Sequence, residues 1–325
     1  MIIAELLRWK EWYHSKLSLF VFANYYLLFL SAELTVSDLF PVILLICWFI
    51  LLMAFGYMIN DYSDQFSDRA AGKEKPMSKL KKNHQILILL LTFCSTFLIL
   101  LPFYQDPIVL ILSLCNLALA LMYSAPPFRL KERGIWGIIG AAMAQWMVPV
   151  VIVFAVFGHY HVDTFVFAGI YLLIGLRFMF THQLHDYPND IRSGTTTFAV
   201  VHTPGKTYSL ARVLFSAELL FLLALIALIA VSNPFFIALM TAYLLFFMTC
   251  LYPVLRKKGL PQLLSSFDTI PLADLYFFWL PFCLSLFLGL KNPVFFIVTL
   301  VELVWKREYL RYYKDMIWLQ RTAGV

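Results

Sequence analysis

The sequence predicts an all-α membrane protein, a polytopic bundle of nine transmembrane helices. Composition carries much of this prediction, because 62% of the 325 residues are hydrophobic and only 14% are charged, unlike the balance of a soluble domain. The apolar stretches also approach the ~20 residues that a helix needs to cross a bilayer. Stretches of this length and apolarity are too long to be strands of a membrane barrel.

Nine apolar stretches follow one another through a single domain, residues 1–325. They run roughly over 17–35, 39–59, 84–103, 107–123, 135–157, 163–184, 207–231, 234–252 and 270–290. Residues 1–16 are short and charged, which favours an amphipathic lead-in on the membrane surface over a removable signal peptide. Residues 292–325 form an atypical C-terminal segment. Its apolar part, 292–305, is short for a crossing, and we favour a tilted tenth crossing over an interfacial helix.

Lys and Arg are concentrated in alternate connections between the apolar stretches. They occur before residue 17 and in the loops 60–83, 124–134 and 253–268, whereas the connections near 31–40, 104–107, 158–163 and 232–234 hold none. This alternation follows the positive-inside rule and accounts for the net charge of +6 without nucleic acid as a partner. It predicts that the amino terminus and the loops at 60–83, 124–134, 185–206 and 253–268 lie in the cytoplasm.

Three carboxylates follow the second apolar stretch, in the sequence NDYSDQFSD that begins at Asn60. The spacing of Asp61, Asp64 and Asp68 places them on one face of a helix. Carboxylates this close repel one another, and a divalent cation is the simplest partner that stabilises them. Oxygen ligands without His or Cys suit Mg²⁺, which shares its coordination shell with substrate phosphates. The sequence therefore predicts a Mg²⁺ site at the end of this stretch.

A second acidic pair, Asp186 and Asp190, lies at the cytoplasmic end of the sixth stretch, and the loops around both clusters supply cations. The candidate phosphate contacts are Lys73, Lys75, Lys131, Arg133 and Arg192, with Lys131 and Arg133 favoured over Arg129 in their loop. Carboxylates, Mg²⁺ and cations together describe a diphosphate site, because the metal bridges anionic protein and anionic ligand while cations neutralise the remaining oxygens. In a membrane protein, we expect this ligand to carry an apolar tail.

Further polar side chains lie near these motifs or inside the apolar stretches. His182 and Gln183 precede Asp186 by one helical turn. With Tyr123 they are the candidates for the cavity or acceptor side, with His182 as a general base, or they are packing residues. Glu218 is a carboxylate within the seventh stretch, and intramembrane acids invite a functional hypothesis.

The acidic motifs resemble those of the UbiA superfamily of intramembrane prenyltransferases. The first motif of that family, Asn-Asp-x-x-Asp-x-x-x-Asp, is matched at Asn60, Asp61, Asp64 and Asp68, and the second, Asp-x-x-x-Asp, at Asp186 and Asp190. The segment YSAPPFRLKERG, which begins at Tyr123, is similar to the Tyr-Ser-x-Pro-Pro signature of the family. Three motifs in order, at the ends of stretches two, four and six, make the resemblance specific.

The resemblance implies that the nine helices surround a central cavity, with two Mg²⁺ ions held by the acidic motifs and an isoprenyl diphosphate as the prenyl donor. The family ionises the allylic carbon–oxygen bond of the donor and passes the prenyl group to an acceptor, which we expect to be lipophilic or aromatic. The chain departs from the family pattern at Lys75, where many members carry an Arg before the proline, so the bidentate guanidinium is lost. Pro188, inside the second motif, biases Tyr187 away from helical geometry, so a shared helix face for Asp186 and Asp190 does not follow.

Two other functions fit parts of the pattern. A terpene cyclase of the same fold would use the same diphosphate site without an acceptor. A cation-coupled transporter also carries intramembrane acids in paired motifs. Against the transporter, both acidic clusters lie on one predicted membrane side and are followed by basic residues that a bare cation site would not favour.

Overall fold

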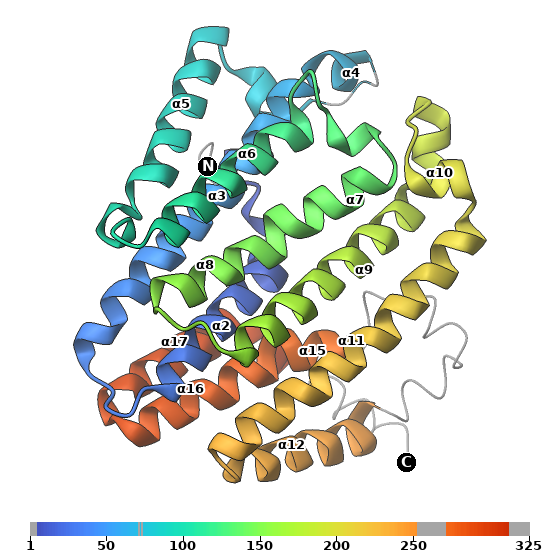
Figure 1. Ribbon diagram of the computed structural model, residues 1–325. Coiled ribbons are helices and arrows are strands. Elements are labelled where there is room, and N and C mark those ends of the chain that lie inside the picture. Colours follow the sequence, from blue (N-terminus) through green and yellow to red (C-terminus); the bar gives the residue numbers. More distant parts are fainter. Residues whose placement is uncertain (1–4, 71, 73, 252–270, 312–325) are drawn as a thin grey trace. The chain divides into compact units, whose positions relative to one another are not determined.

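The computed structural model describes residues 5–70, 72, 74–251 and 271–311, and in these ranges it consists of helices joined by turns (Figure 1). Within this part of the chain, six helices are long and apolar enough to cross a membrane: Val36–Ser63, Lys82–Phe103, Pro107–Ser124, Ile135–Val156, Val162–Arg192 and Pro204–Ser232. They correspond to stretches two to seven of the prediction. The remaining described apolar helices are shorter, so an integral membrane helical protein is confirmed, whereas the number nine stays a prediction.

The chain divides into two compact units. Unit 1 comprises Met1–Lys16 and Pro41–Leu225, and unit 2 comprises Leu17–Phe40 and Ile226–Val325. The helices of unit 1 are, in order, η1 (Trp9–Glu11), η2 (Tyr13–Leu17), α3 (Leu39–Ser63), α4 (Gln65–Ala70), η4 (Pro76–Lys79), α5 (Lys82–Leu98), η5 (Leu101–Phe103), α6 (Pro107–Ser124), η6 (Leu130–Glu132), α7 (Ile135–Ala142), η7 (Met143–Met147), α8 (Val148–Val156), α9 (Val162–Ser193), α10 (Phe198–His202) and most of α11 (Pro204–Ser232).

Local sequence explains where the helices next to the acidic motifs begin and end. Asp106 caps α6, because its side chain accepts a hydrogen bond from the Ile108 amide at 2.8 Å, and Pro107 occupies the first helical position. Gly194 ends α9 with a left-handed backbone (φ 68°), a conformation that glycine adopts readily. The second acidic motif therefore occupies the last turns of α9.

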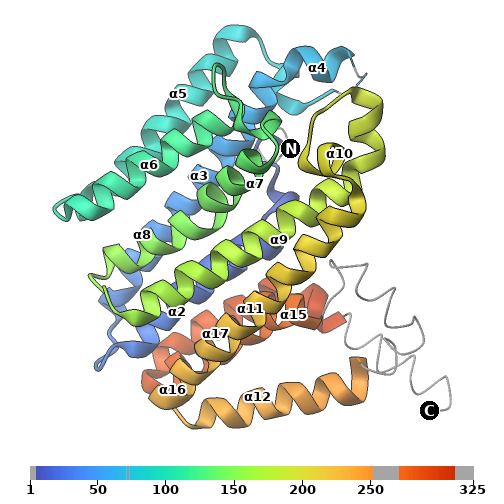
Figure 2. The same ribbon diagram turned by 45° about the vertical axis from the view of Figure 1, so that its right-hand side comes forward.

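Helix α9 runs without a break from Val162 to Ser193 beside α7 and α8 (Figure 2). The prediction that Pro188 disturbs the helix at Tyr187 is wrong in this respect. Proline removes one amide donor from the helix. Here the missing hydrogen bond lies within the last two turns of α9, and the earlier turns are held by packing against α7, η7 and α8. Asp186 and Asp190, four residues apart, therefore do share a helix face.

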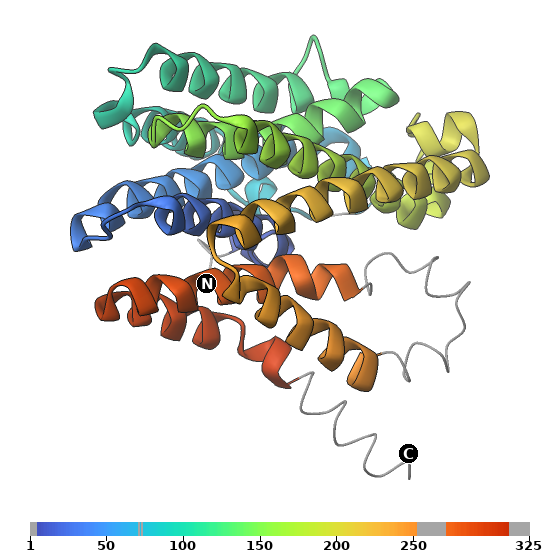
Figure 3. The ribbon, with the colours of Figure 1, turned by 60° about the horizontal axis from the view of Figure 1, so that its bottom comes forward.

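Unit 2 contains α2 (Ser18–Leu30), η3 (Val36–Asp38), α12 (Phe235–Phe246), η8 (Phe247–Leu251), α15 (Pro271–Asp274), η10 (Leu275–Trp279), α16 (Leu280–Lys291), η11 (Pro293–Phe295) and α17 (Phe296–Trp305). Helix α16 packs against both α2 and α17, and Figure 3 shows α16 and α17 side by side. Close packing is possible because Gly289 has no side chain: a Cβ there would lie 2.4 Å from the ring of Phe296. The predicted short segment 292–305 is thus helical and packed within unit 2.

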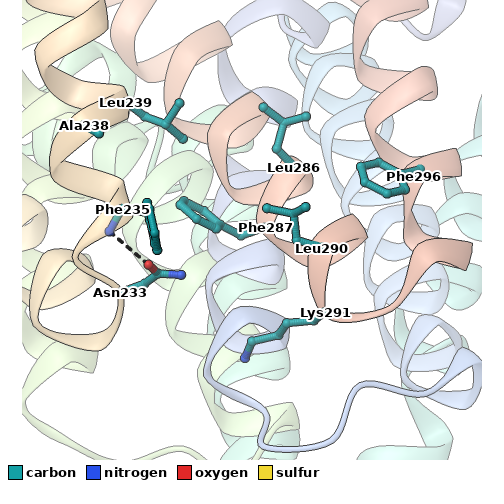
Figure 4. A pocket seen from close by; sticks show the side chains of 9 residues that line it. All are labelled: Asn233, Phe235, Ala238, Leu239, Leu286, Phe287, Leu290, Lys291 and Phe296. Atoms are coloured by element: carbon teal, nitrogen blue, oxygen red, sulfur yellow. Dashed lines mark hydrogen bonds between the residues drawn. The ribbon is translucent and has the colours of Figure 1, made fainter.

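An apolar hollow of about 490 Å³ lies between α12 and α16 in unit 2 (Figure 4). Phe235, Leu239 and Phe287 are among its lining residues. Lys291 stands at its rim, and its ammonium group donates hydrogen bonds to the carbonyl oxygens of Phe29 and Ser31 at the end of α2. The lysine therefore caps a helix C-terminus, where a cation is favoured.

Candidate functional site

The first acidic motif lies where α3 passes into α4. Asn60 and Asp61 belong to the last turn of α3, and Asp68 belongs to α4. Helical hydrogen bonds continue across the junction, from the Asp64 amide to the Asn60 carbonyl (3.0 Å) and from the Asp68 amide to the Asp64 carbonyl (2.8 Å). Because this geometry is helical, the three carboxylates lie on one side of the backbone, as the spacing predicts.

Lys131 joins two members of this motif. Its ammonium group donates to Asn60 Oδ1 at 2.9 Å and to Asp64 Oδ1, while the Ser124 hydroxyl also donates to Asn60 Oδ1 at 3.2 Å. Arg129 Nη2 donates to Asp64 Oδ1 at 3.2 Å. Burial lowers the pKa of the Lys131 ammonium below its usual range, while the hydrogen bond and the charge of Asp64 act in the opposite direction. The cluster is therefore a compact set of acidic and basic groups.

The loop that carries Lys131 rests on α7 because of a glycine. A Cβ at Gly137 would lie 2.6 Å from the Leu130 carbonyl oxygen and 2.9 Å from the Lys131 Cα, so only glycine allows this approach. Arg129 has a left-handed backbone (φ 40°), which is uncommon for a residue other than glycine. The position of both cations is thus fixed by backbone features of the 129–137 segment.

Asp61 is the most deeply buried carboxylate of the motif, with 1% of its side chain exposed. Arg8 Nη1 donates to Asp61 Oδ1 at 2.9 Å, although 53 residues separate them. In the described part of the chain, no hydrogen-bond partner reaches the other oxygen, Oδ2. A buried carboxylate oxygen without a partner is costly unless a ligand uses it.

Arg8 belongs to the segment that the sequence analysis placed on the membrane surface, and here the structure adds contacts that the sequence did not indicate. Trp12 is fully buried, donates through Nε1 to the Leu7 carbonyl at 2.9 Å and packs edge-on against Phe49. Lys16 donates at 3.1 Å to the hydroxyl of Tyr57, a residue that precedes Asp61 by one helical turn. Lys16 also donates to the side chain of Gln145 in η7. The segment therefore packs against α3 and η7 as part of unit 1.

The second acidic motif has a different environment. Asp186 is 37% exposed and lies 3.3 Å from His182 Nε2, and the His182 side chain is itself 66% exposed. Asp190 accepts a hydrogen bond from the Thr197 hydroxyl at 3.0 Å. Gln183 is buried and accepts from the Ala199 amide at 3.3 Å. Gln183 thus joins α9 to α10, as expected for a packing residue, and most of the His182 side chain is exposed.

A short path of contacts connects the loops that follow the two motifs. The Thr196 hydroxyl donates to the Glu132 carbonyl oxygen at 3.4 Å, and the Glu132 carboxylate accepts from Arg129 Nη2 at 2.5 Å. Arg129 in turn contacts Asp64. The loop after α9 and the loop after α6 therefore lie next to each other at the same end of unit 1.

The other predicted residues divide into those that approach the first motif and those that do not. Lys75 and Asp68 are close enough to Asp61 to act on it electrostatically, as Tyr123 is to Asp64. Arg133 donates instead to the Phe128 and Pro127 carbonyl oxygens of its own loop, at 2.5 and 3.0 Å. Arg192 is exposed. Lys73 lies outside the described residues.

The acidic groups fit Mg²⁺ in chemical kind. They offer carboxylate and amide oxygens, and Asp61 presents an oxygen without a partner. Across the described ranges, no three His, Cys, Asp or Glu side chains lie close enough together to hold a metal ion between them. Mg²⁺ usually binds through one or two carboxylates, with water and substrate phosphates as the remaining ligands.

The fold and this cluster define a class: an integral membrane helical protein with acidic and basic side chains gathered at one end of unit 1. Comparison with known proteins gives the family. Residues 19–280 match the UbiA prenyltransferase family, and the chain belongs to this family. The search of curated proteins gave no match.

Solved structures share the fold at low sequence identity. A UbiA homolog from Archaeoglobus fulgidus bound to GPP and Mg²⁺ is 16% identical, covers 92% of this chain and 99% of its own, and superposes with a TM-score of 0.59. The same homolog bound to DMAPP and Mg²⁺ is 16% identical over 87% of this chain and 99% of its own, with a TM-score of 0.57. Digeranylgeranylglyceryl phosphate synthase is 14% identical over 98% of this chain and 95% of its own, with a TM-score of 0.51.

Proposed function

We propose that this protein is a Mg²⁺-dependent intramembrane prenyltransferase that ionises an isoprenyl diphosphate and transfers the prenyl group to a lipophilic or aromatic acceptor. One observation carries the proposal. The buried Asp61 oxygen, which has no partner among the residues that the structure describes, lies in the same motif as Asn60 and Asp64, which share Lys131. A member of a prenyltransferase family that combines a free carboxylate oxygen with adjacent cations is suited to bind a metal diphosphate.

The proposed metal ligands are Asn60, Asp61, Asp64, Asp68, Asp186 and Asp190, and two Mg²⁺ ions would share them. Bound Mg²⁺ would neutralise charge on the diphosphate and so favour its departure. Lys131 and Lys75 are proposed to bind the remaining phosphate oxygens, because the Lys131 ammonium group donates to Asp64 and Lys75 is close enough to Asp61 to act on it electrostatically. Lys73, Arg133 and Arg192 are weaker candidates, since Arg133 is engaged with its own loop and Arg192 is exposed.

The donor is proposed to be an isoprenyl diphosphate because solved homologues of this fold carry DMAPP or GPP with Mg²⁺. On the acceptor side, Tyr123 is the best supported of the predicted polar residues, since it is close to Asp64. His182 is a weaker general base because most of its side chain is exposed. Tyr57, about one helical turn before Asp61 along α3, and Gln145 both accept a hydrogen bond from Lys16 and add further polar groups.

For topology, we propose nine crossings, with the amino terminus and both acidic motifs on the cytoplasmic side. The distribution of Lys and Arg among the connections supports this orientation. The three crossings beyond the six long helices would be formed by α2, by α12 with η8, and by η10 with α16. Helix α17 would then be a short tenth crossing or lie at the interface.

The test uses purified protein in detergent with Mg²⁺, radiolabelled isoprenyl diphosphates of several chain lengths and a lipid extract as the acceptor pool. Asp64→Asn preserves side-chain shape but removes the charge, and Glu33→Gln, at an exposed position, is the matched control. Mg²⁺-dependent release of diphosphate by the unmodified protein and by Glu33→Gln, but not by Asp64→Asn, would support the site. Diphosphate binding that survives both Asp64→Asn and removal of the metal would refute it.

The mass of the labelled product separates transfer from cyclisation. A product heavier than the prenyl group by an acceptor would identify a transferase. A cyclic hydrocarbon or alcohol that retains only the prenyl carbons would identify a terpene cyclase on the same fold.

A further inference from the structure

Arg8 is held in an unusual backbone conformation at the first acidic motif. Its φ and ψ angles are 45° and 38°, in the left-handed region. In the described ranges, Arg8, Arg129 and Thr203 are the residues other than glycine with positive φ. Two of these three are the arginines that contact Asp61 and Asp64. Residues held in such sparsely populated conformations tend to cluster at functional sites.

The position of Arg8 does not depend on its ion pair alone. Leu6 and Trp12 on either side are buried, and Trp12 anchors the segment against Phe49. The guanidinium carbon of Arg8 lies 4.9 Å from the ring centroid of Tyr57. Tyr57 precedes Asp61 by one helical turn. The segment therefore presents the Arg8 side chain to the motif and would keep its course if that side chain were changed.

The chemistry of Arg8 suits a phosphate ligand. Nε and Nη2 donate to the Glu11 carboxylate, both at 2.6 Å, and Nη1 donates to Asp61. Each terminal nitrogen of a guanidinium carries two N–H groups, so one donor on Nη1 and one on Nη2 remain for a further acceptor. A planar guanidinium binds phosphate oxygens in pairs, which the ammonium group of the neighbouring Lys75 does not do.

We propose that Arg8 is a donor-binding residue that holds Asp61 in the ligand-free protein and binds the diphosphate when the metal complex enters. This inference rests on the proposed function. Arg8 precedes residue 19, where the match to the family begins, so the contact is a feature of this chain beyond the matched region. The buried Asp61 then has a positive partner both before and after the ligand binds.

The test is equilibrium binding of labelled geranyl diphosphate with Mg²⁺ to purified full-length protein in detergent, paired with thermal unfolding of the same samples. Arg8→Asn is the main variant, because asparagine tolerates the left-handed backbone better than most residues. Arg8→Lys retains the positive charge but lacks the planar guanidinium that binds two phosphate oxygens at once. Lys10→Asn, at an exposed position of the same segment, is the matched control.

We expect Arg8→Lys, which keeps a charge beside Asp61, to raise the dissociation constant with no fall in unfolding temperature. Arg8→Asn should raise the dissociation constant further, about 10-fold or more, and lower the unfolding temperature because Asp61 loses its counter-charge, whereas Lys10→Asn should change neither. Unchanged or tighter binding by Arg8→Asn would overturn the inference. A loss of binding confined to Arg8→Asn, with its lower unfolding temperature, while Arg8→Lys binds like the unmodified protein, would assign Arg8 a structural role and also overturn it. Absence of binding by the unmodified protein would overturn the proposed function itself.

Discussion

Arg177 and Glu218 form a bidentate ion pair between α9 and α11, with Nε and Nη2 of the arginine 2.6 and 2.9 Å from the two carboxylate oxygens. Both side chains are almost fully buried, with 3% and 0% exposed. The guanidinium also lies 5.0 Å from the ring centroid of Phe178 and 5.4 Å from that of Phe215. An intramembrane acid invites a functional hypothesis, but here a complete set of partners indicates that Glu218 holds two helices together.

Glu218→Gln should therefore lower stability strongly, by about 3–5 kcal/mol, because it leaves the Arg177 cation buried without a counter-charge. Thermal unfolding in detergent measures the loss. The double variant Arg177→Met with Glu218→Leu should recover most of it, since two apolar side chains of similar volume need no partner. An unfolding temperature for Glu218→Gln equal to that of the unmodified protein would contradict the structural role of this pair.

Lys131→Met should weaken Mg²⁺-dependent binding of geranyl diphosphate by about 10-fold to 100-fold, because a charge-assisted contact to phosphate is worth about 1.5–3 kcal/mol. Lys131→Arg should retain part of the affinity, since the charge remains. Lys82→Met removes a lysine at an exposed position at the start of α5 and serves as the control. Equal dissociation constants for Lys131→Met and Lys82→Met would place the diphosphate elsewhere.

Removal of Mg²⁺ should abolish donor binding but leave the ligand-free protein equally stable. The physical reason is that Asp61 and Asp64 already have positive partners in Arg8, Arg129 and Lys131. The unfolding temperature measured with EDTA and with Mg²⁺ should therefore agree without donor and separate once geranyl diphosphate is added, because only a bound ligand stabilises the native state. A large drop with EDTA in the absence of donor would indicate a structural metal instead.

Gly137→Ala should weaken donor binding through the backbone. A Cβ at this position would meet the Leu130 carbonyl oxygen at 2.6 Å, so the loop that carries Arg129 and Lys131 must move away from α7. Gly205→Ala is the control, because no atom lies within 4 Å of its Cβ and alanine favours a helix over glycine. We expect a higher dissociation constant for geranyl diphosphate with Gly137→Ala and an unchanged one with Gly205→Ala. Unchanged binding with Gly137→Ala would show that the loop position does not matter.

Apolar stretches and acidic spacing are local properties, and they predicted much of the fold. The stretch predicted at 135–157 forms continuous helix from Ile135 to Val156, and the one at 39–59 begins at Leu39 as expected. The helix that begins at Leu39 extends to Ser63, because the first acidic motif continues the helical hydrogen bonds beyond the apolar stretch. The sequence therefore located the motif correctly but assigned part of it to a loop.

The partners of the charged residues could not be predicted in the same way. Arg8 and Asp61 are 53 residues apart, and Arg177 and Glu218 are 41 apart, so no local pattern relates them. The preference for Arg133 over Arg129 as a phosphate contact stays a prediction. It could not include the backbone: the left-handed conformation of Arg129 accompanies its contact with Asp64, whereas Arg133 bonds to carbonyl groups of its own loop. Long-range pairing and local backbone strain are visible only in the folded chain.

Lys306→Met should destabilise unit 2 by about 3–5 kcal/mol. Lys306 is fully buried, donates to the Phe277 carbonyl at 2.7 Å and to the Ser18 hydroxyl, and lies one turn after the buried Glu302. Glu302 accepts a hydrogen bond from Tyr25 at 3.3 Å, and in the described residues its other oxygen has no partner. Loss of the lysine leaves this carboxylate without a nearby cation.

Hydrogen exchange of the α17 amides measures this effect, because the two residues attach α17 and its end to α2 and η10. We expect faster exchange in Lys306→Met and partial recovery when Glu302→Leu is added, since the second change removes the unpaired charge. Arg307→Met, at the neighbouring exposed position, should exchange like the unmodified protein. Identical exchange in Lys306→Met and Arg307→Met would show that apolar packing, such as that of Phe296 on Gly289, attaches α17 without help from the polar cluster.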